Sequence, residues 1–282
     1  MRYLLAAVNL GPATDTLADF AAHLALDLEL DAVRLVHVRS LFPAHSAAPT
    51  SFLTEEQVLA GLQETAQRIR SVTQRWVRTE YEVHVGDLAE AVLRAGAGAE
   101  LVLLGQSSNR GALRRLLGEA SEGILEAATC PVLVVPPGMP WRAPERIALA
   151  VDDRPLSPVA IGRLRWLAAR YGSALEVFHR DDGDAFTPAE EVATMLADLS
   201  YSYHHDKDGG RLVRYLTEAA SEVGADWLAV IHHPRAAWRE ALSRNDSERV
   251  AEEAELPVLV LSERTAAARP RASASPASHE LP

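Results

Sequence analysis

The chain has 282 residues and a formal net charge of −11, and 48% of its residues are hydrophobic. This length and composition predict a folded protein with one large domain or two ordinary ones, and they exclude a chain that is disordered throughout. The acidic balance argues against general binding to nucleic acid or to an anionic membrane.

Two rare residue types narrow the choice of sites further. Cys130 is the only cysteine, so no intrachain disulfide or CxxC pair can form, and we expect a buried structural thiol. Lys207 is the only lysine, and no glycine-rich loop precedes it, which excludes a Walker-type phosphate loop. The apolar run Leu4–Val8 is too short for a signal peptide or a membrane span. We therefore expect a cytoplasmic protein with no nucleic-acid or membrane partner.

Short apolar runs alternate with segments of helical periodicity along the first half of the chain. The run 101–104 has no polar alternation, which is typical of a parallel strand that is covered on both faces. Strands are predicted at 2–8, 32–38, 80–85, 100–104 and 131–135, and helices at 13–28, 54–76, 87–97 and 119–128. This alternation predicts an α/β fold with a doubly wound parallel sheet.

The second half repeats the first in the same order. The first copy has additional residues, which we place in the Pro-, Ser- and Ala-rich stretch 41–53. Strands of the second copy are predicted at 145–151, 174–178, 200–204, 226–231 and 257–261. The matching segments are Leu4–Asn9 with Ile147–Asp152, Ala99–Leu104 with Ala225–Val230, and Cys130–Val135 with Leu256–Leu261.

The repeat predicts two tandem domains. Repeated prolines in Pro136–Pro140 interrupt both helix and central strand and mark the boundary between the copies. The end of the chain is dominated by Ala, Arg, Ser and Pro, a composition that cannot bury enough apolar surface to fold. The predicted parts are domain 1 at 1–138, a linker at 139–144, domain 2 at 145–262 and a disordered tail at 263–282.

A loop containing Gly, Ser and Asn follows the fourth predicted strand of the first copy, from Gly105 to Gly111. Glycines at a strand end let backbone amides approach a phosphate, and the next helix adds the positive end of its dipole. The same residues also occur in loops simply because they form turns. The spacing alone leaves both readings open.

This loop, the Leu-Arg-Arg-Leu-Leu-Gly stretch at 113–118 and the Cys-Pro-Val-Leu-Val-Val strand at 130–135 resemble the universal stress protein family, here in a tandem form. The resemblance implies two Rossmann-like domains of the adenine nucleotide alpha hydrolase type, and an ATP-binding loop of spaced glycines in domain 1. It also implies that Asp152, at the end of the strand Ala-Val-Asp, faces an adenosine. The family pairs its domains through their last strands, here 131–135 and 257–261.

Several residues depart from the family pattern in domain 1. Ser108 stands where the family has its middle glycine, Glu119 replaces a phosphate-binding Ser or Thr, and Asn9 replaces the strand-end Asp. A carboxylate beside a polyphosphate is repulsive. Glu119 is either an internal substitute for phosphate at the helix N-terminus or an ordinary exposed first-turn acid. The resemblance implies candidate positions of degenerate nucleotide sites at Asn9, Gly105, Ser107, Ser108, Gly111, Gly118 and Glu119 in domain 1, and at Asp152 in domain 2.

The second copy lacks the glycine motif altogether. Pro234 removes a backbone donor from the corresponding loop, and Asn245 with Glu248 forms a candidate capping box that would satisfy the helix amides internally. Asp152 is the one retained position.

No constellation for metal binding or catalysis stands out. Adjacent histidines on a strand point to opposite faces, so neither His204-His205 nor His232-His233 chelates a metal well unless the two pairs converge. The acidic segment 181–184 lacks the terminal Glu of a calcium loop, and no GxSxG motif is present. Arg110, Arg114 and Arg115 fit a solvated face better than a phosphate site. We expect no metal and no catalytic residue.

Three functions remain open. The favoured one is a non-enzymatic scaffold or signalling protein of a bacterial-type stress response, with degenerate nucleotide sites. The alternative is a sensor that binds ATP or another adenine nucleotide through domain 1. A slow ATPase or hydrolase is the third, but it lacks an identifiable base or nucleophile. Expected partners are the second domain of the same chain, a second copy of the chain in a homodimer, and an unknown regulatory protein.

Overall fold

The computed structural model describes residues 1–39, 53–105, 123–125, 127–151, 154–180, 188–206, 212–232 and 256–265, and every structural statement below concerns these residues. The expected insertion at 41–53 and the tail at 263–282 therefore fall almost wholly outside the described ranges. Among the described helices, none is both long enough and apolar enough to cross a membrane.

Strands and helices alternate through the first half as the periodicity predicts. Each predicted strand is found, and its ends move by no more than a few residues. The elements are β1 (Tyr3–Ala7), α1 (Thr14–Asp27), β2 (Ala32–Arg39), α2 (Glu55–Val72), β3 (Arg78–Val85), α3 (Leu88–Ala95), β4 (Leu101–Gly105) and β5 (Val132–Val135). Of the helix predicted at 119–128, residues 123–125 and 127 are helical, and 106–122 and 126 are outside the described ranges.

The second half has the same alternation. Its elements are β6 (Arg146–Val151), α6 (Pro158–Tyr171), β7 (Ala174–Arg180), α7 (Ala189–Met195), β8 (Tyr201–Asp206), α8 (Leu212–Glu222), β9 (Trp227–His232) and β10 (Val258–Ser262).

Helix α2 shows why the sequence-based ends were only approximate. It begins at a capping box, in which the Thr54 side chain accepts from the Gln57 amide and the Gln57 side chain accepts from the Thr54 amide. The prediction carried this helix on to residue 76, and that was wrong. Gln74 and Arg75 have φ values of 49° and 68°, so the chain leaves the helix in a left-handed turn that the apolar periodicity does not reveal.

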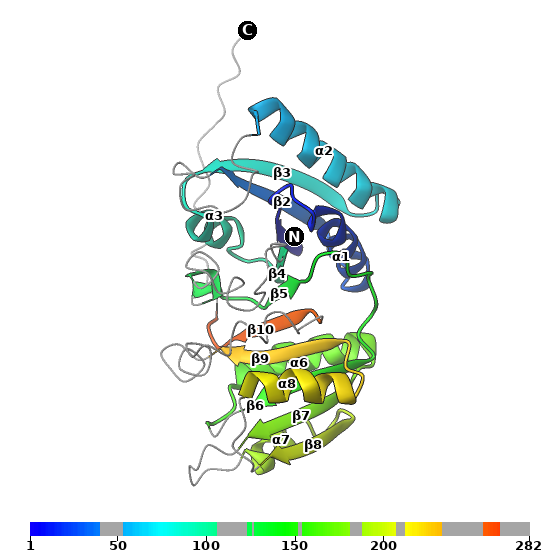
Figure 1. Ribbon diagram of the computed structural model, residues 1–282, viewed down its shortest axis with the longest axis vertical. Helices are drawn as coiled ribbons and strands as arrows, with labels where there is room; N and C mark the ends of the chain where they lie inside the picture. The colour runs from blue at the N-terminus through cyan, green and yellow to red at the C-terminus, as the bar shows by residue number, and fades with distance from the viewer. Residues whose placement is uncertain are drawn as a thin grey trace.

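All the described strands form a single sheet in the order β3-β2-β1-β4-β5-β10-β9-β6-β7-β8 (Figure 1). The pair β5–β10 is antiparallel, with Leu133 opposite Leu259, and the other pairs are parallel. Strands β6 to β10 of the second half correspond in chain order to β1 to β5 of the first. With this correspondence, the strand order is symmetric about the β5–β10 pair. The predicted α/β class with a mostly parallel sheet is confirmed.

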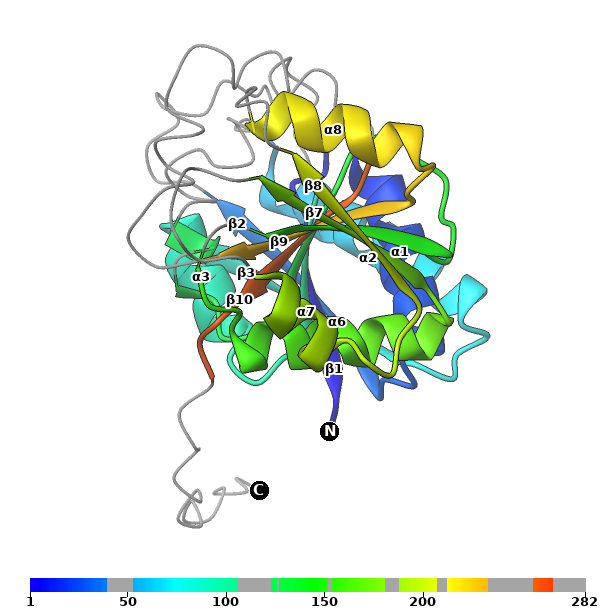
Figure 2. The ribbon, with the colours of Figure 1, turned by 90° about the horizontal axis from the view of Figure 1, so that it is seen from below.

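The hydrophobic core runs through both halves without interruption. Residues of α1, α2, α6 and α7 pack in one cluster on one face of the sheet, and this cluster includes both Leu133 and Leu259. The other face is covered by α3 in the first half and by α8 in the second (Figure 2). Because the two strand sets share a sheet and a core, the boundaries at 138 and 145 stay a prediction.

The segment that follows the prolines after β5 contacts both halves of the chain. Trp141 meets Phe20 of α1 edge-on at 5.0 Å between ring centroids and stacks on His23 at 5.5 Å. On the other side it contacts Tyr171 of α6 and Trp227 of β9, at 6.4 and 6.3 Å. Burial raises the pKa of Tyr171, and the charge of Asp27 adds to the effect. A segment predicted as a spacer therefore packs aromatic surface from both copies together.

Arg163 of α6 forms hydrogen bonds both with the carboxyl end of β10 and with the first half of the chain. Its guanidinium donates to the carbonyl of Ser262 at 2.6 Å and to the carbonyl of Thr129. The Ser262 hydroxyl in turn donates to the Ala128 carbonyl at 2.6 Å. These polar contacts close one end of the β5–β10 junction.

Cys130 lies just before β5 and is 6% exposed. Burial raises its pKa to about 11, so the thiol is protonated at neutral pH. The prediction of a buried structural thiol is confirmed.

Candidate functional site

The first half has a topological switch point between β1 and β4. The chain builds the sheet outward from β1 through β2 to β3, and on the other side of β1 it places β4 and β5. In open α/β sheets, ligands bind beyond the carboxyl ends of the strands at such a point. Ala7, which ends β1, lies beside Leu104 of β4. Asn9 and Gly105 are thus placed at the same edge of the sheet.

Asn9 is exposed, and its side chain shapes the turn from β1 into α1. Its Oδ1 accepts a hydrogen bond from the Gly11 amide at 3.1 Å, and the Gly11 carbonyl accepts from the Thr14 amide at 2.9 Å as α1 begins. Leu10, between them, has a φ of 54°. This is the side-chain-to-backbone bond that Asn and Asp commonly make in turns, and it engages the Asn9 carbonyl internally.

Gly105 ends β4 directly against the start of α1. A Cβ atom at this position would lie 3.3 Å from the Cβ of Ala13 and 3.5 Å from Cδ1 of Leu17. A Cβ atom here would be slightly too close to Ala13, so a neighbour would have to shift by a few tenths of an ångström. The absence of a side chain therefore has a packing reason at Gly105, whether or not a ligand approaches its backbone.

His37 of β2 is a polar residue at this edge that the sequence interpretation missed. It is 6% exposed, and its Nδ1 lies 2.8 Å from the carbonyl of Val8, the residue after β1. A carbonyl only accepts, so Nδ1 carries the hydrogen, and in the neutral ring Nε2 is the acceptor. Burial lowers the pKa of His37; the bond to Val8 opposes this shift, and the charge of Arg39 adds to it. The available signal was a histidine between Val36 and Val38 in a predicted strand.

Acidification is expected to destabilise the protein in part through His37. Its pKa in the folded state lies below the reference value of 6.5, so the unfolded chain binds the proton first as the pH falls. The contribution of the neutral His37 ring to stability is therefore fully present above the pKa that His37 has in the unfolded chain. It is lost as the pH drops through about 6.5 toward the lower pKa of the folded state. Urea unfolding of wild type and His37→Gln across this range should show a shallower dependence on pH in the variant.

A matched control is His84→Gln, which removes a histidine that lies beside Glu82 on β3. An unchanged pH dependence in His37→Gln would contradict the assignment of a neutral buried ring.

The remaining candidate positions lie outside the described residues, so their placement stays a prediction. In the first half these are Ser107, Ser108, Gly111, Gly118 and Glu119, with the three arginines of the same loop. In the second half they are Asp152, Pro234, Asn245, Glu248 and the acidic segment 181–184.

His232 is not brought to His204 and His205, and His233 lies outside the described residues. Strands β6 and β7 lie between β9, which ends at His232, and β8, which carries His204 and His205. His204 stacks on Phe178 at 4.6 Å, with its Nε2 2.8 Å from Glu176, whereas His205 stacks on His179 at 4.9 Å. Within the described ranges, no three His, Cys, Asp or Glu side chains gather as a metal site requires.

Comparison with protein families gives one match in the first half of the chain. Residues 1–136 match the universal stress protein family. This range runs from β1 to the end of β5, and the match does not extend to the second strand set. A search of curated protein sequences found no match.

Solved structures resemble the chain over nearly its whole length. A universal stress protein from Archaeoglobus fulgidus has a TM-score of 0.67 at 17% identity, covering 92% of this chain and 96% of its own. A putative universal stress protein from Pseudomonas aeruginosa has a TM-score of 0.60 at 17% identity, covering 93% of both chains. A functionally unknown protein from the same species has a TM-score of 0.60 at 18% identity, covering 93% of this chain and 92% of its own. At these identities the likeness shows a shared fold.

Proposed function

We propose, from the family match of residues 1–136, that the chain is a tandem universal stress protein that acts in a stress response as a non-enzymatic scaffold or signalling protein. The match itself supports a universal stress protein domain in the first half. The reversed strand order across the β5–β10 junction supports a second domain of the same kind.

Asn9 carries the proposal that the nucleotide site is degenerate. At the switch point, where the family resemblance implies an acid facing the adenosine, the chain has a neutral amide. The carbonyl oxygen of this amide already accepts from Gly11 at 3.1 Å. Glu119, in the sequence position of a phosphate-binding hydroxyl, would add repulsion toward a polyphosphate. Both substitutions would weaken binding of the same nucleotide.

A continuous core supports the scaffold role. The aromatic contacts of Trp141 and the β5–β10 pairing join the two halves through one sheet and one core. A body joined in this way presents a fixed arrangement of surfaces to a regulatory protein, and this does not require turnover.

An adenine-nucleotide sensor is the second candidate. The observation that favours it is the position of Asn9 and Gly105 together at the switch point of the first half, where this class of sheet binds ligands. An amide side chain also retains hydrogen-bonding capacity toward a sugar or a base.

Nucleotide binding separates the two candidates. For the scaffold, purified protein should release no nucleotide on denaturation, and added ATP should leave its Tm unchanged. The double variant Asn9→Asp, Glu119→Ser restores the family residues, and its Tm should rise with ATP, since a ligand at about 100 times its Kd stabilises by about 2.7 kcal/mol. Asp at position 9 can still accept from Gly11, so the turn is preserved.

Co-purified nucleotide, or a saturable rise in the Tm of the wild type with ATP, would overturn the scaffold and support the sensor. Metal-dependent hydrolysis of ATP by the wild type would instead support an enzyme.

A further inference from the structure

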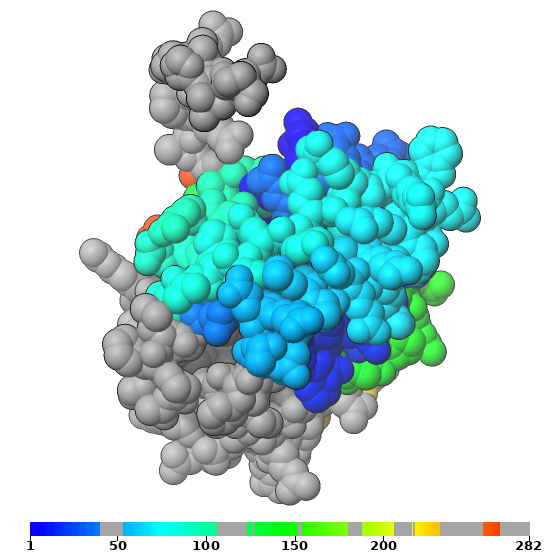
Figure 3. All heavy atoms as spheres, turned by 90° about the horizontal axis from the view of Figure 1, so that it is seen from above, coloured from blue at the N-terminus to red at the C-terminus, as the bar shows by residue number. Residues whose placement is uncertain are grey.

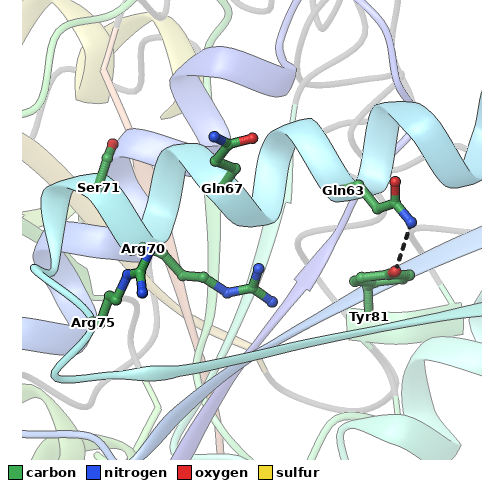
Figure 4. Close-up of a pocket in the computed structure, with 6 residues that line it drawn as sticks. All are labelled: Gln63, Gln67, Arg70, Ser71, Arg75 and Tyr81. Atoms are coloured by element: carbon green, nitrogen blue, oxygen red, sulfur yellow. Dashed lines mark hydrogen bonds between the residues drawn. The ribbon is translucent and has the colours of Figure 1, made fainter.

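A polar pocket lies between α2 and β3, at the end of the sheet farthest from β8. It has a volume of about 530 Å³ and is lined by Gln63, Gln67, Arg70, Ser71, Arg75 and Tyr81. Figure 4 shows the Arg70 side chain running from α2 into the space above β3, with Arg75 coming from the turn between the two elements. Figure 3 looks onto this end of the molecule, where α2 and β3 form the outer surface.

The two guanidinium groups are the notable feature of this pocket. Among the described residues, neither Arg70 nor Arg75 has a carboxylate within ion-pair distance, and no acid lines the pocket. Arg70 donates to the Thr79 carbonyl at 3.0 Å, which holds its side chain across the gap. Arg68, on the same helix, is by contrast bound at 2.7 Å to Asp19. In a chain with a net charge of −11, two arginines that line one pocket without an acid favour an external anion there.

The backbone places Arg75 next to Arg70. Gln74 and Arg75 both adopt left-handed φ values, 49° and 68°, which residues with a Cβ rarely adopt consecutively. The Arg75 amide donates to the Arg70 carbonyl at 3.1 Å, which folds the turn back on the last turn of the helix. Strained backbone of this kind is typical of sites where a side chain has to be held in one position.

The dipole of α2 does not account for both arginines. A helix C-terminus carries a partial charge equivalent to roughly half an electron, and Arg70 in the last turn already exceeds it. Arg75 lies beyond the helix and adds a second full charge. The pocket is therefore positive overall, despite its place at a helix C-terminus.

We propose that this pocket binds the dianionic phosphate group of a small phosphorylated molecule. One guanidinium satisfies a carboxylate by two parallel hydrogen bonds, whereas a phosphate monoester offers three oxygens and close to two charges, which suits two guanidiniums approaching from different elements. The Gln67 amide supplies a further donor, and Gln63 is held by its bond to the Tyr81 hydroxyl at 3.2 Å. The Ser71 hydroxyl already donates to the Arg68 carbonyl at 2.7 Å and is left with acceptor capacity only. The volume suits a small ligand.

The site is separate from the candidate nucleotide site. Arg75 lies in the turn that leads into the amino end of β3, whereas Asn9 and Gly105 lie at the carboxyl ends of β1 and β4. Strands β1, β2 and β3 are parallel, so these are opposite edges of the sheet. Phosphate binding here stands or falls independently of ATP binding at the switch point.

The test is a titration of the full chain, at constant ionic strength, with inorganic phosphate and with glycerol 3-phosphate, using acetate as the comparison anion. The readout is the NMR shift of the side-chain signals of Gln67 and of Arg70 Nε–H. Both phosphates should give saturable shifts, and acetate should not. Arg75→Gln, an exposed change outside the helix, should weaken binding at least about tenfold, as loss of a charge-assisted hydrogen bond predicts.

Arg94→Gln is the charge-matched control, because Arg94 is an exposed arginine that pairs with Glu90 on α3. It should bind phosphate like the wild type. Equal affinity in Arg75→Gln and Arg94→Gln, shifts that do not saturate, or equal shifts with acetate would each overturn the proposal. Loss of binding in Arg70→Gln counts in its favour only if the Tm of that variant is retained, since Arg70 also holds Thr79.

Discussion

Replacing Leu259 with alanine is expected to lower the free energy of unfolding by about 3 kcal/mol. Leu259 of β10 has no exposed surface, lies opposite Leu133 in the antiparallel pair, and belongs to the core cluster that spans both halves. Removing its side chain leaves a cavity at the junction of the two strand sets, where rigid strands on both sides limit collapse. The cost should therefore lie within the range found for large-to-small changes in well-packed cores.

Urea unfolding monitored by circular dichroism measures this effect. Because the core is shared, wild type and variant should each unfold in one cooperative transition. Leu59→Ala, the same chemical change at a leucine of α2 that is 37% exposed, serves as the control and should cost much less. Two separate transitions in the wild type, or equal losses in both variants, would mean that the halves fold independently.

The second large effect is expected at Trp141, where alanine should also cost about 3 kcal/mol. Its ring contacts Phe20 and His23 of the first half and Tyr171 and Trp227 of the second. Aromatic pairs at these separations contribute beyond the area they bury. The ring is only partly buried, which places the expected loss at the low end of the range for Trp→Ala.

Trp76→Ala is the control for this prediction. Trp76 lies in the turn before β3 and is 83% exposed, so its removal should change the free energy of unfolding by no more than about 0.5 kcal/mol. Chemical denaturation of both variants gives the comparison. A loss at Trp141 as small as that at Trp76 would show that the segment after β5 only spans the two halves.

The pairing of β5 with β10 also determines which strands remain at the ends of the sheet. These are β3 and β8. Strand β3 carries Arg78, Glu80 and Glu82 on one face, and such charges disfavour pairing with a further strand. A homodimer, which remains a prediction, would therefore form more readily through helices than through β3.

The strand positions could be predicted because they depend on the pattern of apolar residues within each short segment. A run such as Leu101–Leu104 is apolar at four consecutive positions, and a short run of this kind is typical of a strand that is covered on both faces. The end of α2 could not be predicted, because Gln74 and Arg75 adopt left-handed φ values although neither is the glycine that usually marks such a turn.

The residues of the candidate site also differ in whether the sequence could predict them. Gly105 and Asn9 could be selected because they follow strands, and strand ends are where this class of sheet places its ligands. His37 could not, because its significance depends on the Val8 carbonyl, which lies 2.8 Å from its ring just after the neighbouring strand β1.

The sequence by itself determined the α/β class, the repeat and the strands, since these depend on periodicity and on similarity between segments. Length and charge allowed either one large domain or two; the repeat favoured two, and the tertiary structure showed one sheet and one core joining both strand sets. Only the tertiary structure decided that Trp141 packs between the copies and that Arg70, Arg75 and Tyr81 line one pocket. The physical reason is that these contacts arise from the folded chain, whose geometry brings together side chains that no local pattern connects.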